Sequence, residues 1–339
     1  MLSEEEERTL NSIKIKSDND PNNPEFPPKN PKFPATSTFK INVPGFSNVW
    51  FKDESENPTG THKDRMAWEI VVTYRDILFS KKIDNIKKIP QMSIITSGTA
   101  GYTIQKWLRE YGLPNLKCLV DFNLSQDVKN KLEEIGCEVF ETDLSKKPFS
   151  WKEILEITDN ESGVDITSSE ALDPTTRYYD WLGYEIINNS PDYCFIPFGT
   201  GNLYENVLNV TKREITSVSG HDPRFSGSID KLRKCNFIGA TTNNPKTKAD
   251  KLYSPHLPFV HFGEQWIKVY KHAAYCGKDS NVYVLKEKYL ELAIKLGRDL
   301  GLNFEASGIA GMGMLLQMKE NIPKDAKILI VSTGKTKYS

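Results

Sequence analysis

The alternation of short apolar runs with amphipathic stretches is the feature that most restricts the fold of this chain. Seven apolar runs each predict a buried strand, at residues 93–97, 116–122, 137–143, 193–198, 235–240, 281–285 and 326–332. Between them, stretches such as residues 131–136 and 289–301 carry apolar side chains at three- and four-residue steps, which is typical of helices. The pattern predicts an α/β protein with mostly parallel sheets.

Size and charge exclude several classes of function. The 339 residues suffice for one large or two ordinary domains, and a net charge of −1 gives no reason to expect nucleic acid or a membrane surface as partner. No apolar run reaches the roughly 20 residues that cross a bilayer, and the first residues lack the features of a secretory signal. We therefore expect a soluble, cytoplasmic protein with a small-molecule partner.

The cysteines give no sign of a metal or disulfide framework. All five are far apart, without a CxxC pair or a histidine at ligand spacing: Cys118, Cys137, Cys194, Cys235 and Cys276. We expect reduced, mostly buried thiols and no metal site.

Residues 1–45 differ from the rest of the chain. Closely spaced prolines forbid a continuous helix and favour an extended path, so this segment is predicted to be an extended, proline-rich strap. Its interspersed Phe26, Phe33 and Phe39 predict that part of the strap packs on the globular body. The acidic run at residues 4–7 is expected to be a solvated, frayed end.

Three glycine-containing turns follow predicted strands, where parallel sheets bind their ligands: residues 96–101, residues 198–202 and residues 332–334. In FGTGNL, residues 198–203, backbone N–H groups could approach a phosphate, although a tight turn that needs a positive φ explains the glycines equally well. The third glycine of the dinucleotide fingerprint is missing, which disfavours NAD. In TSGTAG, residues 96–101, hydroxyl and backbone donors could hold a carboxylate or simply cap a helix.

The stretch NPTGTHKDR, residues 57–65, places Lys63 at the predicted start of a helix. The helix dipole disfavours a cation there and favours the neutral, nucleophilic amine, although most lysines are simply solvated. Such amines form Schiff bases with carbonyl compounds. A phosphate turn, a carboxylate turn and a reactive lysine together match the needs of pyridoxal phosphate holding an amino acid.

The segment FKDESENPTGTHKDRMA, residues 51–67, resembles the cofactor-lysine segment of the fold type II pyridoxal-phosphate enzymes, the tryptophan synthase β family. The first two glycine turns and STGK, residues 332–335, match that family in the same order. The resemblance implies two three-layer domains with pyridoxal 5'-phosphate in the cleft between them. Residues 46–85 and 181–339 would form the large cofactor domain, residues 86–180 a small mobile domain, and the chain a homodimer.

The resemblance also implies the site residues. Lys63 would hold the cofactor as a Schiff base and act as the catalytic base. The remaining cofactor-binding residues would be Thr99, Gly199, Thr200, Gly201, Asn202, Leu203 and Thr333. The substrate carboxylate would be held by Thr96, Ser97, Gly98, Thr99, Ala100 and Gly101.

Thr333 would face the pyridine nitrogen of the cofactor. A hydroxyl cannot keep that nitrogen protonated as a carboxylate would, so a long-lived carbanion is not favoured. We therefore expect β-elimination or β-replacement, through an aminoacrylate, on serine, threonine or an O-acetyl or O-phospho amino acid. Transamination is not expected.

Two alternatives stay open. A threonine synthase-like γ-replacement on O-phosphohomoserine would need a second anion site, for which Arg177 and Lys246 are candidates. Thr99 instead of the family's usual asparagine, His62 at a usually apolar or aromatic position, and Asn202 instead of a common glycine allow a binding protein without turnover. We expect His62 to pack behind the helix and residues 241–266 to shape the acceptor site.

Overall fold

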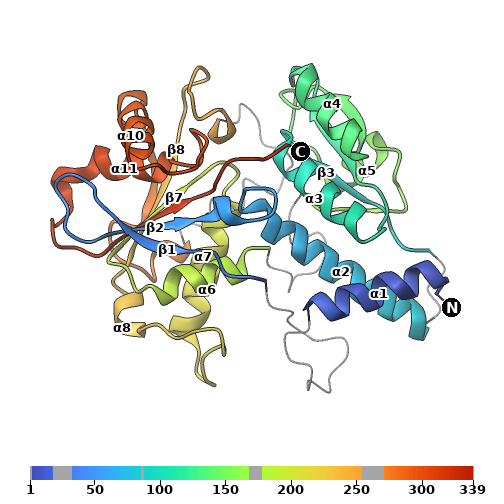
Figure 1. Ribbon diagram of the computed structural model, residues 1–339, viewed down its shortest axis with the longest axis horizontal. Coiled ribbons are helices and arrows are strands. Elements are labelled where there is room, and N and C mark those ends of the chain that lie inside the picture. The colour runs from blue at the N-terminus through green and yellow to red at the C-terminus, as the bar shows by residue number, and fades with distance from the viewer. Residues whose placement is uncertain (1, 18–32, 85–87, 168–177, 254–270, 339) are drawn as a thin grey trace.

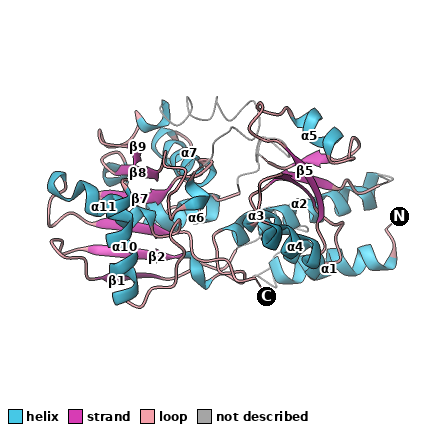
Figure 2. Cartoon of the chain, turned by 90° about the horizontal axis from the view of Figure 1, so that it is seen from above, coloured by secondary structure: helices cyan, strands magenta, loops and turns pink. Residues whose placement is uncertain are grey.

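Two β-sheets organise the protein, and both are mostly parallel (Figure 2). The computed structural model describes residues 2–17, 33–84, 88–167, 178–253 and 271–338. The large sheet has the order β1 (Thr38–Ile41), β2 (Val49–Asp53), β10 (Ile328–Ser332), β7 (Tyr193–Pro197), β8 (Asn236–Thr241) and β9 (Asn281–Val284). The small sheet has the order β5 (Glu138–Thr142), β4 (Lys117–Asp121), β3 (Met92–Ile95) and β6 (Val164–Asp165). Among the strands of the described residues, only the β1–β2 pair is antiparallel, so the predicted α/β class is confirmed.

Helices cover both faces of each sheet (Figure 1). Their bounds are α1 Glu4–Ser17, α2 Lys63–Asp84, α3 Thr99–Glu110, α4 Gln126–Ile135, α5 Trp151–Ile157, α6 Asp180–Asn188, α7 Asn202–Thr216, α8 Ile229–Leu232, α10 Glu287–Asp299 and α11 Ala310–Met318. Short 3-10 turns occupy η1 (Glu54–Glu56), η3 (Asp250–Leu252) and η4 (Lys319–Asn321).

Strand β10 shows how the layers form. Its residue Ile328 pairs with Val49 of β2 on one side and with Tyr193 of β7 on the other. Ile328 and Ile330 belong to the apolar cluster that contains α10 and α11, whereas Leu329 and Val331 belong to the one that contains α6 and α7. The side chains of a strand alternate between faces, so a continuous apolar run is required of a strand covered on both sides.

All seven predicted strands are present, but two are not buried. Strands β5 and β9 lie at sheet edges, and Glu138, Glu141 and Val284 are exposed. The expectation of burial was wrong for these two because an edge strand is covered less completely than a central one.

The amino-terminal segment corrects another prediction. Residues 4–17 form helix α1 instead of an extended, frayed end. Ser3 and Glu6 form a reciprocal cap, with the Glu6 N–H donating to Ser3 Oγ and the Ser3 N–H donating to Glu6 Oε2. Glu6 also pairs with Lys81 of α2 at 2.6 Å, and Leu10 is buried. The prolines start only at Pro21, after the helix has ended, so they do not prevent it.

The predicted packing of the strap is confirmed for the residues that the structure describes. Phe33 is buried, with its ring centroid 6.3 Å from that of Trp68 and 6.1 Å from that of Trp107. Phe39 is half-buried against Phe51. Phe26 lies outside the described residues.

Helix α2 belongs to an apolar core shared by helices that pack on the small sheet and helices that pack on the large sheet. Ile70 and Tyr74 of α2 share one apolar cluster with Leu108 of α3 and with Leu182 of α6. The helix that begins at Lys63 is therefore anchored on both sides.

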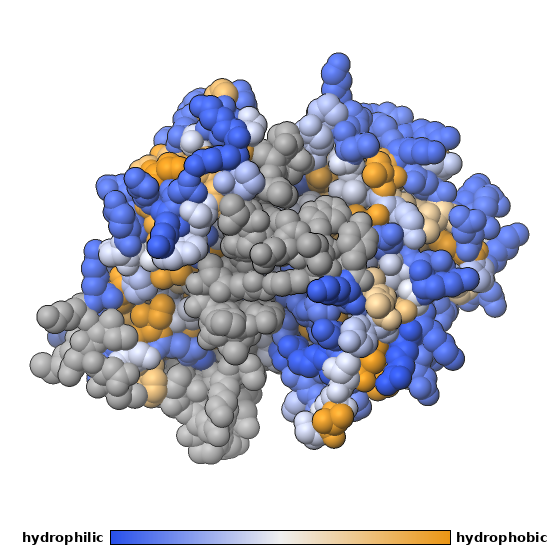
Figure 3. Space-filling model, turned by 180° about the vertical axis from the view of Figure 1, so that it is seen from behind, coloured by the Kyte–Doolittle hydropathy of each residue, from blue (hydrophilic) through white to orange (hydrophobic). Residues whose placement is uncertain are grey.

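In the described residues, neither the surface nor the cysteines indicate a second functional site. Seen from behind, apolar side chains lie in small separate groups among polar ones (Figure 3). All five cysteines are free thiols, and all but Cys276 are buried, as expected. Within the described ranges, none of the helices has the length and apolar character of a membrane span.

Candidate active site

Lys63 is the first residue of α2, as the sequence predicted. The turn before it pairs with the end of the chain: the Lys335 N–H donates to the Gly60 carbonyl at 2.8 Å, and the Lys337 N–H donates to the Thr59 carbonyl at 2.9 Å. Gly60 has φ +79°, and a Cβ there would lie 2.3 Å from the Lys335 carbonyl oxygen. A glycine is therefore required at this position.

Asp64 fixes the same turn from the inside. Its buried carboxylate accepts from the Thr59 N–H at 3.0 Å, from the Thr59 hydroxyl at 2.7 Å and from the Trp107 indole at 2.7 Å. Burial raises the pKa of Asp64, and these hydrogen bonds oppose that rise. The Trp107 contact ties the lysine turn to α3.

The amine of Lys63 donates to the hydroxyl of Tyr179 at 2.9 Å. No carboxylate in the described part of the chain pairs with this amine. Tyr179 is fully buried, and its own N–H donates to Asn206 Oδ1 of α7 at 2.9 Å. The lysine is thereby linked to the helix that follows the glycine turn.

His62, the residue before the lysine, packs on the same tyrosine. Its ring centroid lies 5.3 Å from that of Tyr179, and Nδ1 lies 3.4 Å from the Thr333 carbonyl oxygen. Desolvation, with a contribution from the Lys63 ammonium, lowers the pKa of His62 to about 3. The ring is therefore neutral at physiological pH, and we assign its proton to Nδ1, which can then donate to Thr333. This supports the expected packing role.

The turn at residues 199–203 joins β7 to α7, as predicted. Gly201 precedes the helix with φ +94°, and a Cβ there would lie 2.9 Å from the Phe198 ring. Among the described residues, the N–H groups of Gly199, Thr200, Gly201, Asn202 and Leu203 donate to no protein acceptor. Gly201 and Leu203 are buried, so this helix start presents unpartnered donors away from bulk water.

The turn at residues 96–101 joins β3 to α3. The Thr96 hydroxyl accepts from the N–H groups of Gly98 at 3.1 Å and Gly101 at 3.2 Å, so it caps the turn itself. Ser97 is exposed, and the N–H groups of Ser97, Thr99 and Ala100 have no acceptor in the part of the chain that the structure describes. The donors that the cap uses therefore differ from those that remain free for an anion.

The carboxyl-terminal segment connects these loops. The hydroxyls of Thr99 and Thr336 lie 3.1 Å apart, and the Lys251 amine lies 3.3 Å from Thr336 Oγ1 and 2.5 Å from Glu305 Oε2. A Cβ on Gly199 would lie 2.9 Å from the Lys251 carbonyl oxygen. The structure thus brings the predicted phosphate turn, the carboxylate turn and the segment of Thr333 to one region.

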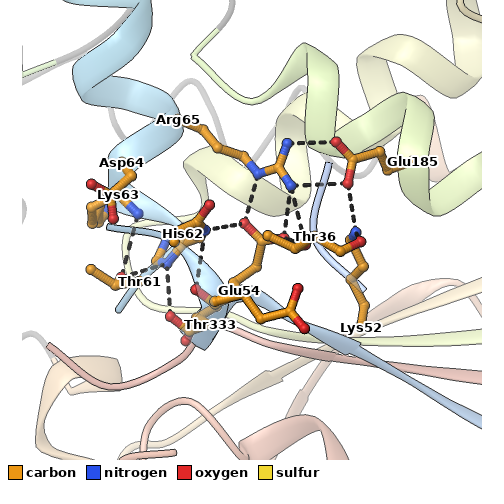
Figure 4. Close-up of polar contacts among 12 residues, drawn as sticks. Thr36, Lys52, Glu54, Thr61, His62, Lys63, Asp64, Arg65, Glu185 and Thr333 are labelled. Atoms are coloured by element: carbon orange, nitrogen blue, oxygen red, sulfur yellow. Dashed lines mark hydrogen bonds and ion pairs between the residues drawn. The ribbon is translucent and has the colours of Figure 1, made fainter. Parts of the chain in front are cut away.

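A buried ion network next to Lys63 was not predicted (Figure 4). The guanidinium of Arg65 bonds Glu54 at 2.6 and 2.9 Å and Glu185 at 2.7 and 2.9 Å, and Lys52 bonds Glu185 at 2.5 Å. Arg65 and Lys52 are each 1% exposed and Glu54 is 0% exposed. Burial alone would raise the pKa of Glu54, but Arg65 and Lys52 lower it to about 2. The network fixes α2 two residues after the lysine.

A family comparison decides what kind of protein this is. The model described as pyridoxal-phosphate dependent enzyme matches residues 35–334. The chain belongs to this family of pyridoxal-phosphate-dependent enzymes. A search among curated proteins finds no match.

Several solved structures of enzymes share the fold. A pyridoxal 5'-phosphate-dependent aspartate racemase superposes with a TM-score of 0.62 at 15% identity, covering 89% of this chain and 91% of the racemase. A hydrogen sulfide-producing enzyme from Fusobacterium nucleatum gives 0.60 at 20% identity, covering 89% and 96%. Threonine deaminase isoform 2 from Solanum lycopersicum gives 0.56 at 16% identity, covering 86% and 80%. Their different reactions show that the fold does not fix the substrate.

The residues of this chain fit the family's cofactor. Pyridoxal phosphate needs an amine and an anion site, and the structure offers the Lys63 amine without a carboxylate partner and the unpartnered donors of residues 199–203.

Sequence reasoning missed Tyr179 and Glu185. Both lie in RYYDWLGYEI, residues 177–186, and neither has a local sequence pattern that would mark it as part of a site. The second-anion candidates receive no support: Lys246 is exposed, and Arg177 lies outside the described residues. Half of the proposed acceptor segment, residues 254–266, also lies outside them.

Proposed function

We propose that this chain is a lyase or synthase that uses pyridoxal phosphate to eliminate or replace the β-substituent of an amino acid. The substrate would be serine, threonine or an O-acetyl or O-phospho derivative. One observation carries the proposal: the Lys63 amine opens α2 and is held by a neutral hydroxyl instead of a carboxylate. An amine without a carboxylate partner can lose its proton and act as nucleophile and base.

Each part of the site has a role in this proposal. Lys63 would hold the cofactor covalently, residues 199–203 would hold its phosphate and Thr333 would meet its ring nitrogen. When bound, the cofactor supplies an electron-withdrawing ring that stabilises negative charge at the substrate α-carbon. The free donors of Ser97, Thr99 and Ala100 would hold the substrate carboxylate.

Lys63 would then move the proton. Its neutral amine would take the proton from the substrate α-carbon, and the β-substituent would leave with its bonding electrons. The hydroxyl that holds this amine belongs to the fully buried Tyr179, which limits access of water on that side.

Cofactor titration tests the first half of the proposal. Wild-type protein should gain the absorbance of a lysine-bound cofactor on addition of pyridoxal phosphate, whereas Lys63→Ala should not. Lys82→Ala is the matched control, because Lys82 lies in the last turn of the same helix in an exposed ion pair with Glu7. Circular dichroism verifies that both variants are folded. Equal absorbance in Lys63→Ala would reject the role of this lysine.

A substrate panel tests the second half. Serine, O-acetylserine and O-phosphoserine should yield pyruvate, threonine should yield 2-oxobutyrate, and added sulfide should divert the reaction to a thiol product if replacement occurs. Absence of turnover with every member, despite bound cofactor, would favour a binding protein instead.

One observation favours the threonine synthase-like alternative. The Lys251 amine lies 3.3 Å from Thr336, whose hydroxyl contacts Thr99 of the carboxylate turn, so a cation lies close to the substrate loops. Its pairing with Glu305 weakens its attraction for a second phosphate. Phosphate release from O-phosphohomoserine, without release from O-phosphoserine, would establish this alternative.

A further inference from the structure

The hydroxyl of Tyr179 makes two hydrogen bonds that its packing role does not require. Its hydroxyl accepts from the Lys63 amine at 2.9 Å and donates its own hydrogen toward Met66 Sδ at 3.8 Å. Met66 lies three residues after Lys63 on the same helix, so the two side chains leave α2 on one face. The thioether sulfur accepts the hydrogen bond of the phenol, and the phenol oxygen remains free to accept one from Lys63.

The direction of these two hydrogen bonds matters for a lysine that must change its protonation state. A carboxylate partner would stabilise the ammonium and remove the base, whereas a phenol oxygen is a neutral acceptor that can bind an N–H of either form. If the phenol hydrogen pointed at the neutral amine, it would occupy the nitrogen lone pair. The Met66 contact directs that hydrogen elsewhere.

The position of Tyr179 is also fixed from three sides. Its N–H is held by Asn206 of α7, its ring packs on His62 at 5.3 Å, and its side chain is fully buried. A group held in this way can orient a mobile lysine without moving itself.

We propose that Tyr179 is a positioning residue for the proton-transfer step of Lys63, an inference that rests on the function proposed above. The phenol oxygen holds one N–H of the neutral amine, which leaves the lone pair free for the substrate. In the step itself an N–H bond forms and the Cα–H bond breaks. The electron pair of that bond forms the Cα=Cβ double bond as the substituent departs with its own bonding electrons. Tyr179 keeps its hydrogen bond to the nitrogen throughout and gives up no proton.

Tyr179→Phe tests this role because it removes only the hydroxyl. We expect kcat to fall about tenfold, the equivalent of one lost hydrogen bond of about 1.4 kcal/mol, with KM changed by less than about twofold. The deuterium isotope effect on kcat, measured with the α-deuterated form of the fastest panel amino acid, should increase. A purely structural loss would reduce the active fraction and leave that isotope effect unchanged.

A second readout does not depend on turnover. Apo protein mixed with pyridoxal phosphate and trapped with borohydride should form the Lys63 adduct, detected by peptide mass spectrometry, more slowly in Tyr179→Phe than in wild type. The matched control is Tyr178→Phe, because the Tyr178 hydroxyl is equally buried but donates to the Ile166 carbonyl at 3.1 Å. The control should load at the wild-type rate.

Met66→Leu provides a second variant of similar volume in case Tyr179→Phe does not fold. It removes the acceptor of the phenol hydrogen, so the hydrogen can turn to the amine, and kcat and the loading rate should both fall. Wild-type rates and isotope effect in folded Tyr179→Phe, or in Met66→Leu where it replaces that variant, would overturn the inference. Wild-type protein that neither loads cofactor nor turns over any amino acid would overturn the proposed function together with it.

Discussion

The amine of Lys63 and the hydroxyl of Tyr179 lie 2.9 Å apart, although 116 residues separate them in the sequence. Lys63 opens α2, and Tyr179 directly precedes α6. The contact joins the lysine turn to the layer of helices that also contains the start of α7. The Lys63 amine is therefore positioned by tertiary structure as well as by its own helix.

Substitution of Gly201 should weaken cofactor binding. Gly201→Ala forces a Cβ to within 2.9 Å of the Phe198 ring at φ +94°, so we expect a loss of about 1–2 kcal/mol in stability. Displacement of the turn should also reduce affinity for pyridoxal phosphate about tenfold, as measured by absorbance titration.

Gly220→Ala is the control for backbone strain. Gly220 has φ +115°, so alanine there causes backbone strain similar to that at Gly201. No atom lies within 4 Å of its Cβ, and the turn at residues 199–203 stays intact. If both variants lost equal cofactor affinity, the turn at residues 199–203 would not be the phosphate site.

Removal of one charge from the buried network should strongly destabilise the protein. Glu54→Gln leaves Arg65 without its charged partner on η1, which we expect to cost about 3–5 kcal/mol in the free energy of unfolding. Denaturant titration measures this loss. Glu291→Gln, in a half-exposed pair with Lys248, should cost less than about 1 kcal/mol.

The same carboxylate predicts a loss of stability in acid. The folded-state pKa of Glu54 is about 2, below its ordinary value of 4.5, so its contribution is fully present above pH 4.5. That contribution is lost as the pH falls from 4.5 to 2. The difference in unfolding free energy between wild type and Glu54→Gln should shrink over this range, and a constant difference would contradict the assignment.

His62 should make the protein sensitive to mild acid. Its folded-state pKa of about 3 lies below its ordinary 6.5, so its contribution is present above pH 6.5 and is lost as the pH falls toward 3. The slope should reach at most about 1.4 kcal/mol per pH unit. His62→Phe keeps the contact with Tyr179 but does not titrate. Parallel urea midpoints for both proteins between pH 7 and 5 would refute a neutral His62.

The Thr99–Thr336 contact should hold the carboxylate turn against the end of the chain. Thr336→Val keeps the shape but loses hydrogen bonds to Thr99 and Lys251, which we expect to cost about 1 kcal/mol. Amide hydrogen exchange at residues 335–337 should become faster. Thr216→Val removes an exposed hydroxyl that bonds only Lys212 and should leave that exchange unchanged.

The sequence patterns predicted those strands, turns and helix starts that depend mainly on residues close together in the chain. Strands such as β10 are visible because both faces are covered, and the glycine turns are visible because a helix start after a strand needs them. Lys63 was found because a cation is unexpected at a helix start, and α1 was missed although Ser3 and Glu6 have the spacing of a capping box.

Contacts between distant residues could not be predicted in this way. Arg65 and Glu185 are separated by 120 residues, and neither has a neighbour in sequence that reveals the other. A buried arginine looks like a solvated one until its partners are known. The substrate, the homodimer and the small mobile domain at residues 86–180 stay predictions.

Because β10 lies between β2 and β7, the large sheet can be completed only after β10 has been synthesised. The hairpin β1–β2 has no other neighbour in the large sheet, and the lysine turn pairs with the stretch that directly follows β10. His62 and Thr333 are separated by 271 positions. During synthesis on the ribosome, the early segment that carries the amine must therefore wait for the partners that β10 and the stretch after it supply until almost the whole described chain has emerged. Chaperones have most reason to bind it in that period.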